Sequence, residues 1–204
     1  MPNWRVHMEI AKRLNEKLNF NDEDLNLFLL GSIAPDINNG YIVKDVSKIC
    51  DHGKTHLYKE EDHSTYTNFY SKYQNILETN PVAYGYFIHL YTDYLLNRDY
   101  EKKCCCNKWN EDECVKVKHK DLRIYDSKYI NNTICLDDYQ KAIQDLKQIE
   151  EISIDEQDIA KVINFLDKKE VPQNLNLEFY SYDELDKEVD DITNQIYKNF
   201  IDIY

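Results

Sequence analysis

The spacing of apolar residues along the chain predicts helices over most of its length. Between residues 5 and 18 apolar side chains recur every three or four positions, which is the spacing of one helical face. A second helix is expected to begin after Asn21, whose side chain can accept hydrogen bonds from the first turn, and to end at Gly31. Further helices are predicted over residues 64–78, 81–96, 137–150, 154–168 and 182–203.

Short signals indicate where several of these helices begin. Asn80 is a suitable cap for the fourth predicted helix, and Pro81 suits its first turn. Ser153 and Ser181 each stand three residues before a glutamate, which is the capping-box pattern. The polar, cysteine-bearing segment 98–133 has no clear periodicity, so we expect it to be mostly loop.

Composition supports a helical chain folded as one domain. The 204 residues include only four glycines and four prolines, too few for many short strands and turns. No repeat and no linker rich in Gly, Pro or Ser divides the chain. We therefore predict an all-α, single-domain multi-helix bundle over residues 1–204. Residues 1–97 contain the candidate metal-site residues, and the acidic residues 98–204 complete the helical core.

The charge of the chain restricts its partners. The formal net charge is −13, with 10 basic and 14 acidic side chains in residues 1–100 and 15 and 24 in residues 101–204. Such a chain repels phosphate backbones and anionic membrane surfaces, so a nucleic-acid partner is disfavoured. The first residues lack the apolar core of a signal peptide, and no apolar run reaches membrane-spanning length. These features predict a cytoplasmic protein without a transmembrane segment.

The six cysteines are expected to be reduced in that compartment. Cys104, Cys105 and Cys106 are consecutive and Cys114 follows eight residues later. Adjacent cysteines do not form the usual CxxC metal clip. A loop of unreactive thiols is the favoured interpretation, with a soft-metal site as the alternative.

The strongest chemical signal is the pair His89 and Asp93. A separation of four residues places both side chains on one face of a helix that is apolar nearly all round. A buried carboxylate is costly unless a cation compensates its charge, and a metal ion held by both residues would do so. A hydrogen-bonded His–Asp pair that only fixes packing explains the spacing equally well.

Three further residues fit a metal site, although each has an ordinary alternative. Asp36 follows a helix end in an apolar Ala-Pro-Asp segment, where it could also form a Pro-Asp turn. His56 lies in a histidine-bearing loop, where a solvated histidine is common. His7 lies on the apolar face of the first helix, where a hydrogen-bonded core histidine is equally plausible. Together with His89 and Asp93 they form the mixed N and O ligand set that suits zinc.

The order of these motifs resembles the zinc-dependent phospholipase C family. The resemblance rests on Trp4-x-x-His7, Gly-Ser-Ile-Ala-Pro-Asp36, Lys-Thr-His56 and Gly-Tyr-Phe-Ile-His89-Leu-Tyr-Thr-Asp93-Tyr, and it covers about residues 1–97. It implies an all-α fold like that shared by phospholipase C and the P1-type nucleases. It also implies that Asp36, His56, His89 and Asp93 hold one metal ion, and that Asp93 bridges to a second ion bound by His7.

The same resemblance implies hydrolysis of a phosphoester by a metal-activated water, with Asp36 as the residue that orients or deprotonates the water. One or two zinc ions are expected, with iron or manganese as alternatives, and the substrate would be a small-molecule or lipid phosphoester. A P1-like nuclease and a non-enzymatic relative with a structural metal are the competing interpretations.

The chain departs from the family pattern in two places. Secreted members begin with the tryptophan, whose amino group helps bind metal, whereas here three residues precede Trp4, so we expect Trp4 to pack against the first helix. The family's downstream pair of histidines with a glutamate is not evident. His119, Asp121 and Asp126 are the candidates to complete the site. His52 and His63 are predicted to be surface residues, because Gly53 interrupts a helix that would align them with His56.

Overall fold

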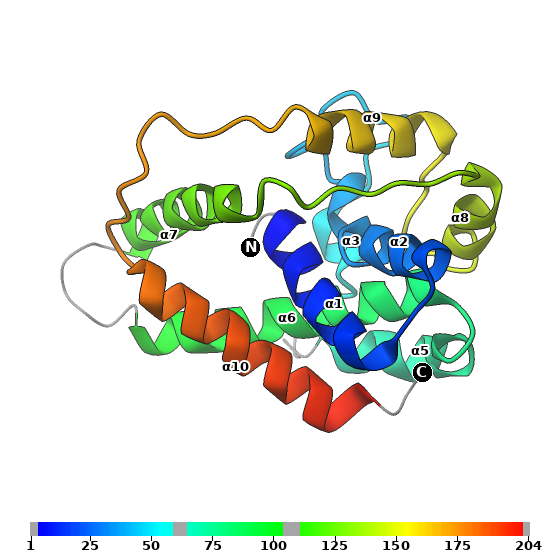
Figure 1. Ribbon diagram of the computed structural model, residues 1–204, viewed down its shortest axis with the longest axis horizontal. Helices are drawn as coiled ribbons and strands as arrows, with labels where there is room; N and C mark the ends of the chain where they lie inside the picture. Colours follow the sequence, from blue (N-terminus) through cyan, green and yellow to red (C-terminus); the bar gives the residue numbers. More distant parts are fainter. Residues whose placement is uncertain (1–3, 59–64, 104–110, 202–204) are drawn as a thin grey trace.

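The computed structural model describes residues 4–58, 65–103 and 111–201. This part of the chain contains ten α-helices, one short 3₁₀-helix and no strand, which confirms the all-α prediction (Figure 1). The elements are α1 Trp4–Leu18, α2 Asp22–Gly31, α3 Ala34–Ile37, α4 His52–Thr55, α5 Thr65–Leu77, α6 Pro81–Lys103, α7 Glu111–Asp126, η1 Ser127–Tyr129, α8 Tyr139–Leu146, α9 Glu156–Asp167 and α10 Tyr182–Phe200.

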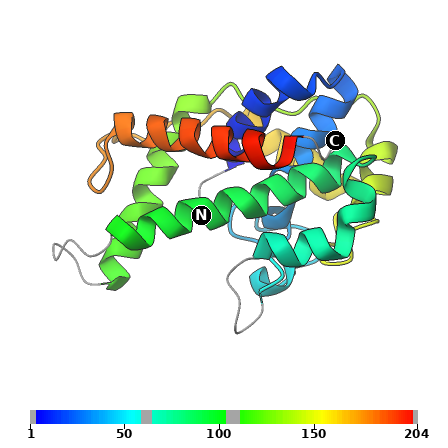
Figure 2. The same ribbon diagram turned by 90° about the horizontal axis from the view of Figure 1, so that it is seen from below.

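Helix α6 forms the centre of the molecule. Every residue from 81 to 93 is buried, as expected for a helix that is apolar nearly all round. Helices α2 and α5 pack against it, and α10 runs along it on the side seen in Figure 2. The predicted His89 and Asp93 therefore lie in the interior and not at the surface.

Two glycines allow α2 and α6 to pack with their backbones in contact. A Cβ atom built on Gly85 would lie 2.3 Å from the carbonyl oxygen of Phe28, and one built on Gly31 would lie 2.2 Å from that of Val82. Any other residue at either position would force the helices apart. This contact fixes the end of α2, and therefore the start of the segment that carries Asp36, against α6.

Most predicted helix boundaries are confirmed. The Asn21 side chain accepts from the Asp24 N–H, and Ser181 begins α10 with a capping box. The box predicted at Ser153 is wrong, because α9 begins two residues later with a box between Asp155 and Asp158. The fully buried Asp158 also accepts hydrogen bonds from the backbone and hydroxyl of Ser47, a tertiary contact that local sequence does not reveal.

The prediction of a mostly irregular segment between residues 98 and 133 is wrong. Helix α6 continues to Lys103, and α7 follows with Cys114, Leu122 and Tyr125 buried on one side of an otherwise polar helix. The narrow apolar face explains why periodicity did not identify it. Cys104–Cys106 lie outside the described residues. Cys50 and Cys135 are free thiols. No helix of the described chain is long and apolar enough to cross a membrane.

Replacing Gly85 with alanine should destabilise the fold by at least about 2 kcal/mol, because the new methyl group would overlap the backbone of α2. Chemical denaturation followed by far-ultraviolet circular dichroism would measure the change. Gly53→Ala is the matched control: its nearest neighbour is the Asp51 side chain at 3.0 Å, which can rotate away, so the change should stay within about 1 kcal/mol. Equal stability of Gly85→Ala and the wild type would contradict this account.

Candidate metal centre

The five residues predicted as metal ligands converge in the interior. His7 comes from α1, Asp36 from α3, His56 from the residue after α4, and His89 and Asp93 from α6. Their exposed fractions lie between 0% and 6%. Two trios have ligand atoms within 4.8 Å of one another, namely His7, His89 and Asp93, and Asp36, His56 and His89. Residues separated by more than 80 positions in the sequence therefore share one buried polar cluster.

The spacing of the ligand atoms of His56, His89 and Asp93 is close to that of a tetrahedral metal site, and Asp36 lies slightly further away. Asp93 Oδ2 lies 3.6 Å from His56 Nε2 and 3.6 Å from His89 Nε2, and these two nitrogens are 3.3 Å apart. The Asp36 carboxylate oxygens lie 3.8 and 3.9 Å from the same nitrogens. Zinc–ligand bonds of about 2.0–2.1 Å give tetrahedral edges of roughly 3.3–3.5 Å. The His–Asp distances exceed the normal range of an N–H···O hydrogen bond, which weakens the alternative of a simple packing pair.

Backbone carbonyl groups orient two of the imidazoles. His89 Nδ1 lies 2.8 Å from the Ser32 carbonyl oxygen, and His56 Nδ1 lies 3.1 Å from that of His52. A carbonyl only accepts, so each Nδ1 is oriented to carry a proton, and the Nε2 of each neutral ring is then available to a metal ion. The two Nε2 atoms are 3.3 Å apart, so a proton of one ring or a shared cation must lie between them. Histidine ligands of metals are commonly oriented in this way.

His7 supplies buried polar atoms without partners. Its ring stacks on that of His89 with centroids 4.0 Å apart, and its Nε2 lies 3.5 Å from Asp93 Oδ1. Among the residues that the structure describes, neither ring nitrogen of His7 nor Asp93 Oδ1 has a hydrogen-bond partner. Buried polar atoms are normally satisfied, so these three atoms require a ligand of another kind. A divalent cation fits this donor set.

The cluster also shifts the protonation of its members. Burial, together with the neighbouring His89, lowers the pKa of His7 to about 4, so His7 is neutral at pH 7 and its lone pair is free. Burial alone would raise the pKa of Asp93, but the contacts with His56, His7 and His89 hold it well below its usual range. Burial opposes protonation of His89, yet Asp93 and Asp36 raise its pKa above the ordinary value. The Asp93 carboxylate is thus kept charged by the histidines that surround it.

Asp36 is positioned by a one-turn helix and not by the Pro-Asp turn that was the alternative. Pro35 stands at the start of α3, which leads Asp36 into the cluster. The carboxylate accepts a hydrogen bond from the Asn39 side-chain amide, with Nδ2 2.7 Å from Oδ1. Asn39 is 7% exposed, so this support is itself buried.

His52 has a closer relation to the cluster than the sequence indicated. Gly53 lies inside the short helix α4 and does not interrupt it. His52 Nδ1 lies 2.6 Å from His56 Nδ1, and the two ring centroids are 3.8 Å apart. The prediction that His52 is a surface residue is therefore wrong, since its side chain is half-buried against His56. His63 lies outside the described residues.

The candidates for a further ligand lie elsewhere. Asp121 accepts hydrogen bonds from the backbone N–H groups of residues 178–180, and Asp126 accepts those of Arg5 and Val6 at the start of α1. His119 is exposed on α7. None of these three joins a group of metal-ligand atoms within the described chain. Trp4 packs in the core with its ring 5.5 Å from that of Phe165, as a residue of α1.

The fold and the cluster define a helical protein whose buried histidines and aspartates fit a metal site. The family model for zinc-dependent phospholipase C matches residues 6–96, the part that contains all five predicted ligands. This match confirms the resemblance identified from the motifs. Comparisons with curated proteins and with solved structures found no match. The family match and the His/Asp groups support a metal-dependent hydrolase.

Replacing His52 with phenylalanine should weaken zinc binding roughly 10- to 100-fold, because the contact that helps hold His56 is lost while the ring volume is kept. Competition against a chromogenic zinc chelator would measure the affinity. The exposed His119 provides the matched control, and His119→Phe should bind zinc like the wild type. An unchanged affinity in His52→Phe would mean that His52 does not position His56.

Proposed function

We propose that this chain is a zinc-dependent phosphoester hydrolase of the phospholipase C type. The observation that carries the proposal is the buried cluster in which the Nε2 atoms of His56 and His89 lie 3.3 Å apart, while His7 and Asp93 retain atoms without hydrogen-bond partners among the described residues. Burying polar atoms without partners costs free energy of folding unless a cation binds to them. The match of residues 6–96 to the zinc-dependent family supports zinc as that cation.

Asp36, His56, His89 and Asp93 would hold one ion, and Asp93 would bridge to a second ion bound by His7. The two oxygens of Asp93 support this division. Oδ2 lies 3.6 Å from the Nε2 atoms of both His56 and His89, whereas Oδ1 lies 3.5 Å from His7 Nε2. One carboxylate thus faces two separate sets of nitrogen ligands.

Bound zinc would lower the pKa of a water molecule and stabilise the charge that develops on the phosphoryl oxygens. Asp36 is the residue proposed to orient or deprotonate that water. Its Oδ1 accepts from the Asn39 amide, which fixes the plane of the carboxylate. The Ser32 carbonyl fixes His89 in the same way. These contacts hold the polar groups in place before substrate binds, which is the main protein contribution to such catalysis.

The substrate class proposed is a lipid or small soluble phosphoester. The net charge of −13 opposes a nucleic-acid substrate, so the nuclease alternative is disfavoured. The remaining alternative is a protein that keeps the fold and uses the metal only for structure. Metal content and hydrolysis must therefore be measured separately.

Protein purified without a metal-affinity tag should contain one or two equivalents of zinc by elemental analysis, and Asp93→Asn should retain less than about a tenth of it after dialysis against a weak chelator. The matched control is Asp121→Asn, since Asp121 is a fully buried aspartate that accepts hydrogen bonds from the backbone N–H groups of residues 178–180 and belongs to no group of metal-ligand atoms in the described chain. Absence of metal from a folded wild type, or equal metal in the two variants, would contradict the proposed site.

The zinc-loaded protein should hydrolyse bis(4-nitrophenyl) phosphate or 4-nitrophenyl phosphate, and Asp36→Asn should lower kcat roughly 10²- to 10⁴-fold. Metal content is measured in the same samples, so that a loss of catalysis is separated from a loss of zinc. Stoichiometric zinc without hydrolysis of either ester, or of a phospholipid in mixed micelles, would favour the structural-metal alternative. Cleavage of single-stranded DNA in preference to these esters would favour a nuclease.

A further inference from the structure

Two of the five proposed ligands, Asp36 and His56, lie at short turns of helix. Helices α3 and α4 contain four residues each, whereas α1 and α6, which carry the other three proposed ligands, contain 15 and 23 residues. A single turn of helix is not stable in water by itself, so its position depends on tertiary contacts. The contacts that hold these two turns therefore determine where Asp36 and His56 lie.

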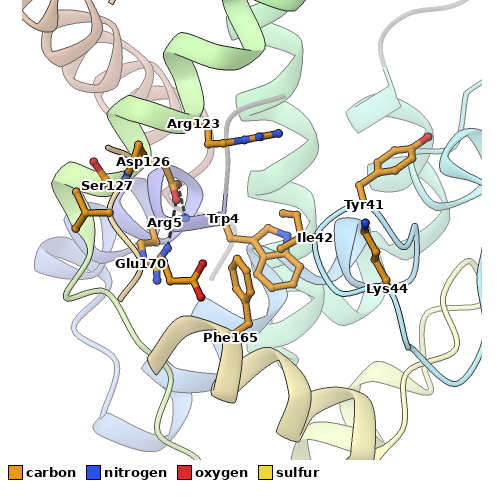
Figure 3. A pocket seen from close by; sticks show the side chains of 12 residues that line it. Trp4, Arg5, Tyr41, Ile42, Lys44, Arg123, Asp126, Ser127, Phe165 and Glu170 are labelled. Carbon is orange, nitrogen blue, oxygen red and sulfur yellow. Dashed lines mark hydrogen bonds and ion pairs between the residues drawn. The ribbon is translucent and has the colours of Figure 1, made fainter. Parts of the chain in front are cut away.

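Helices α1 and α3 have supports close to their ligands. At the first turn of α1, Asp126 accepts from the Arg5 N–H and pairs with the Arg5 guanidinium (Figure 3). Helix α3 follows almost directly after α2, and the Asn39 amide donates to Asp36. Helix α4 is separated from α3 by the irregular residues 38–51, so its position has to be fixed in another way.

Two side chains from α5 and α6 hold the backbone on either side of His56. The Tyr86 hydroxyl of α6 donates to the Thr55 carbonyl. The Asn68 amide of α5 donates to the Leu57 carbonyl, with Nδ2 3.2 Å from the oxygen. His56 is therefore the residue between two peptide groups that are each anchored to a longer helix.

Tyr86 connects His56 to the helix that carries two other ligands. It is fully buried three residues before His89, so the two side chains lie on the same side of α6. Its ring stacks on that of Phe69 with centroids 4.6 Å apart. Burial raises the pKa of the Tyr86 hydroxyl well above its usual range, so the hydroxyl stays protonated and can donate.

Thr55 relates this contact to the imidazole of His56. Thr55 is fully buried, and its hydroxyl oxygen lies 3.0 Å from His56 Nδ1 and 3.2 Å from the His52 carbonyl oxygen. The same His52 carbonyl lies 3.1 Å from His56 Nδ1. A shift of the Thr55 backbone would therefore disturb the groups that orient the ring.

The residue after His56 has a strained backbone. Leu57 has a φ of 53°, in the left-handed region that residues with a Cβ atom adopt at a cost in free energy. Such a conformation persists only where the surrounding structure holds it. The Asn68 amide donates to the carbonyl of this same residue. Loss of that contact would allow the chain after His56 to relax and move the imidazole.

We propose that Tyr86 and Asn68 are positioning residues that set the His56 imidazole against that of His89. Neither belongs to a group of metal-ligand atoms in the described chain. Their contacts keep His56 Nε2 3.3 Å from His89 Nε2, close enough for one ion to contact both nitrogens. The inference rests on the proposed metal-dependent function, and it gives α5, which carries none of the proposed ligands, a part in the site.

Replacing Tyr86 with phenylalanine keeps the ring and removes the donor. Zinc affinity, measured by competition with a chromogenic chelator, should fall roughly 10- to 100-fold. The visible absorption bands of the cobalt(II)-substituted protein should also change, because they report the coordination geometry. The matched control is Tyr84→Phe, which removes a fully buried hydroxyl from the same helix, one that donates to the Phe200 carbonyl at 2.9 Å. It should keep the zinc affinity and cobalt spectrum of the wild type.

A second pair of variants tests the other anchor. Asn68→Leu removes the donor to the Leu57 carbonyl and should lower zinc affinity about ten-fold or more. Asn75→Leu changes an exposed asparagine of the same helix and should bind zinc like the wild type.

The metal-free protein gives a readout that does not require zinc. In long-range ¹H–¹⁵N spectra of the histidine rings, the His56 signals should shift in Tyr86→Phe and Asn68→Leu and stay in place in Tyr84→Phe. Wild-type zinc affinity, cobalt spectrum and His56 signals in Tyr86→Phe and Asn68→Leu would overturn the proposal. A wild type that binds no zinc, with His56 signals that shift as expected, would refute the hydrolase proposal and support the positioning role.

Discussion

The direct backbone contact between α2 and α6 is the constraint on which the site depends. Gly31 and Gly85 leave no side chain between the two helices. The end of α2 therefore lies against the middle of α6, where the Ser32 carbonyl reaches His89 and the following turn delivers Asp36. With side chains at these glycines the two helices would be held further apart, and neither contact would form. The geometry of the candidate metal centre therefore depends on how these two helices pack.

The cluster is a set of polar groups placed where an apolar core would be expected. Burial alone would neutralise Asp93, and it would also disfavour protonated histidines. The unpartnered nitrogens of His7 and the retained negative charge of Asp93 are both satisfied if positive charge is added. A bound cation would therefore balance the charge of the cluster. Hydrolysis is one reaction that a site of this kind can catalyse.

The sequence predicted the elements and residues whose determinants are local. The apolar spacing of α1, the caps at Asn21 and Ser181, and the four-residue spacing of His89 and Asp93 could all be recognised without coordinates. The features that could not be predicted from the sequence depend on tertiary contacts. The role of His52 follows from a short helix through Gly53, and α7 is stabilised by a narrow buried stripe that its polar composition conceals. That all five residues form metal ligands stays a prediction, although the fold places them together.

The contact between Asp126 and the start of α1 has a consequence for the architecture of the chain. The family match ends at residue 96, yet the helix that carries His7 has its first N–H groups capped by a carboxylate at residue 126, and the Arg5 guanidinium donates to the Leu166 carbonyl. A polypeptide restricted to the matched region would begin with an uncapped helix and would leave the Arg5 guanidinium without its carboxylate partner. The acidic second half is thus an internal scaffold for the helix that carries His7.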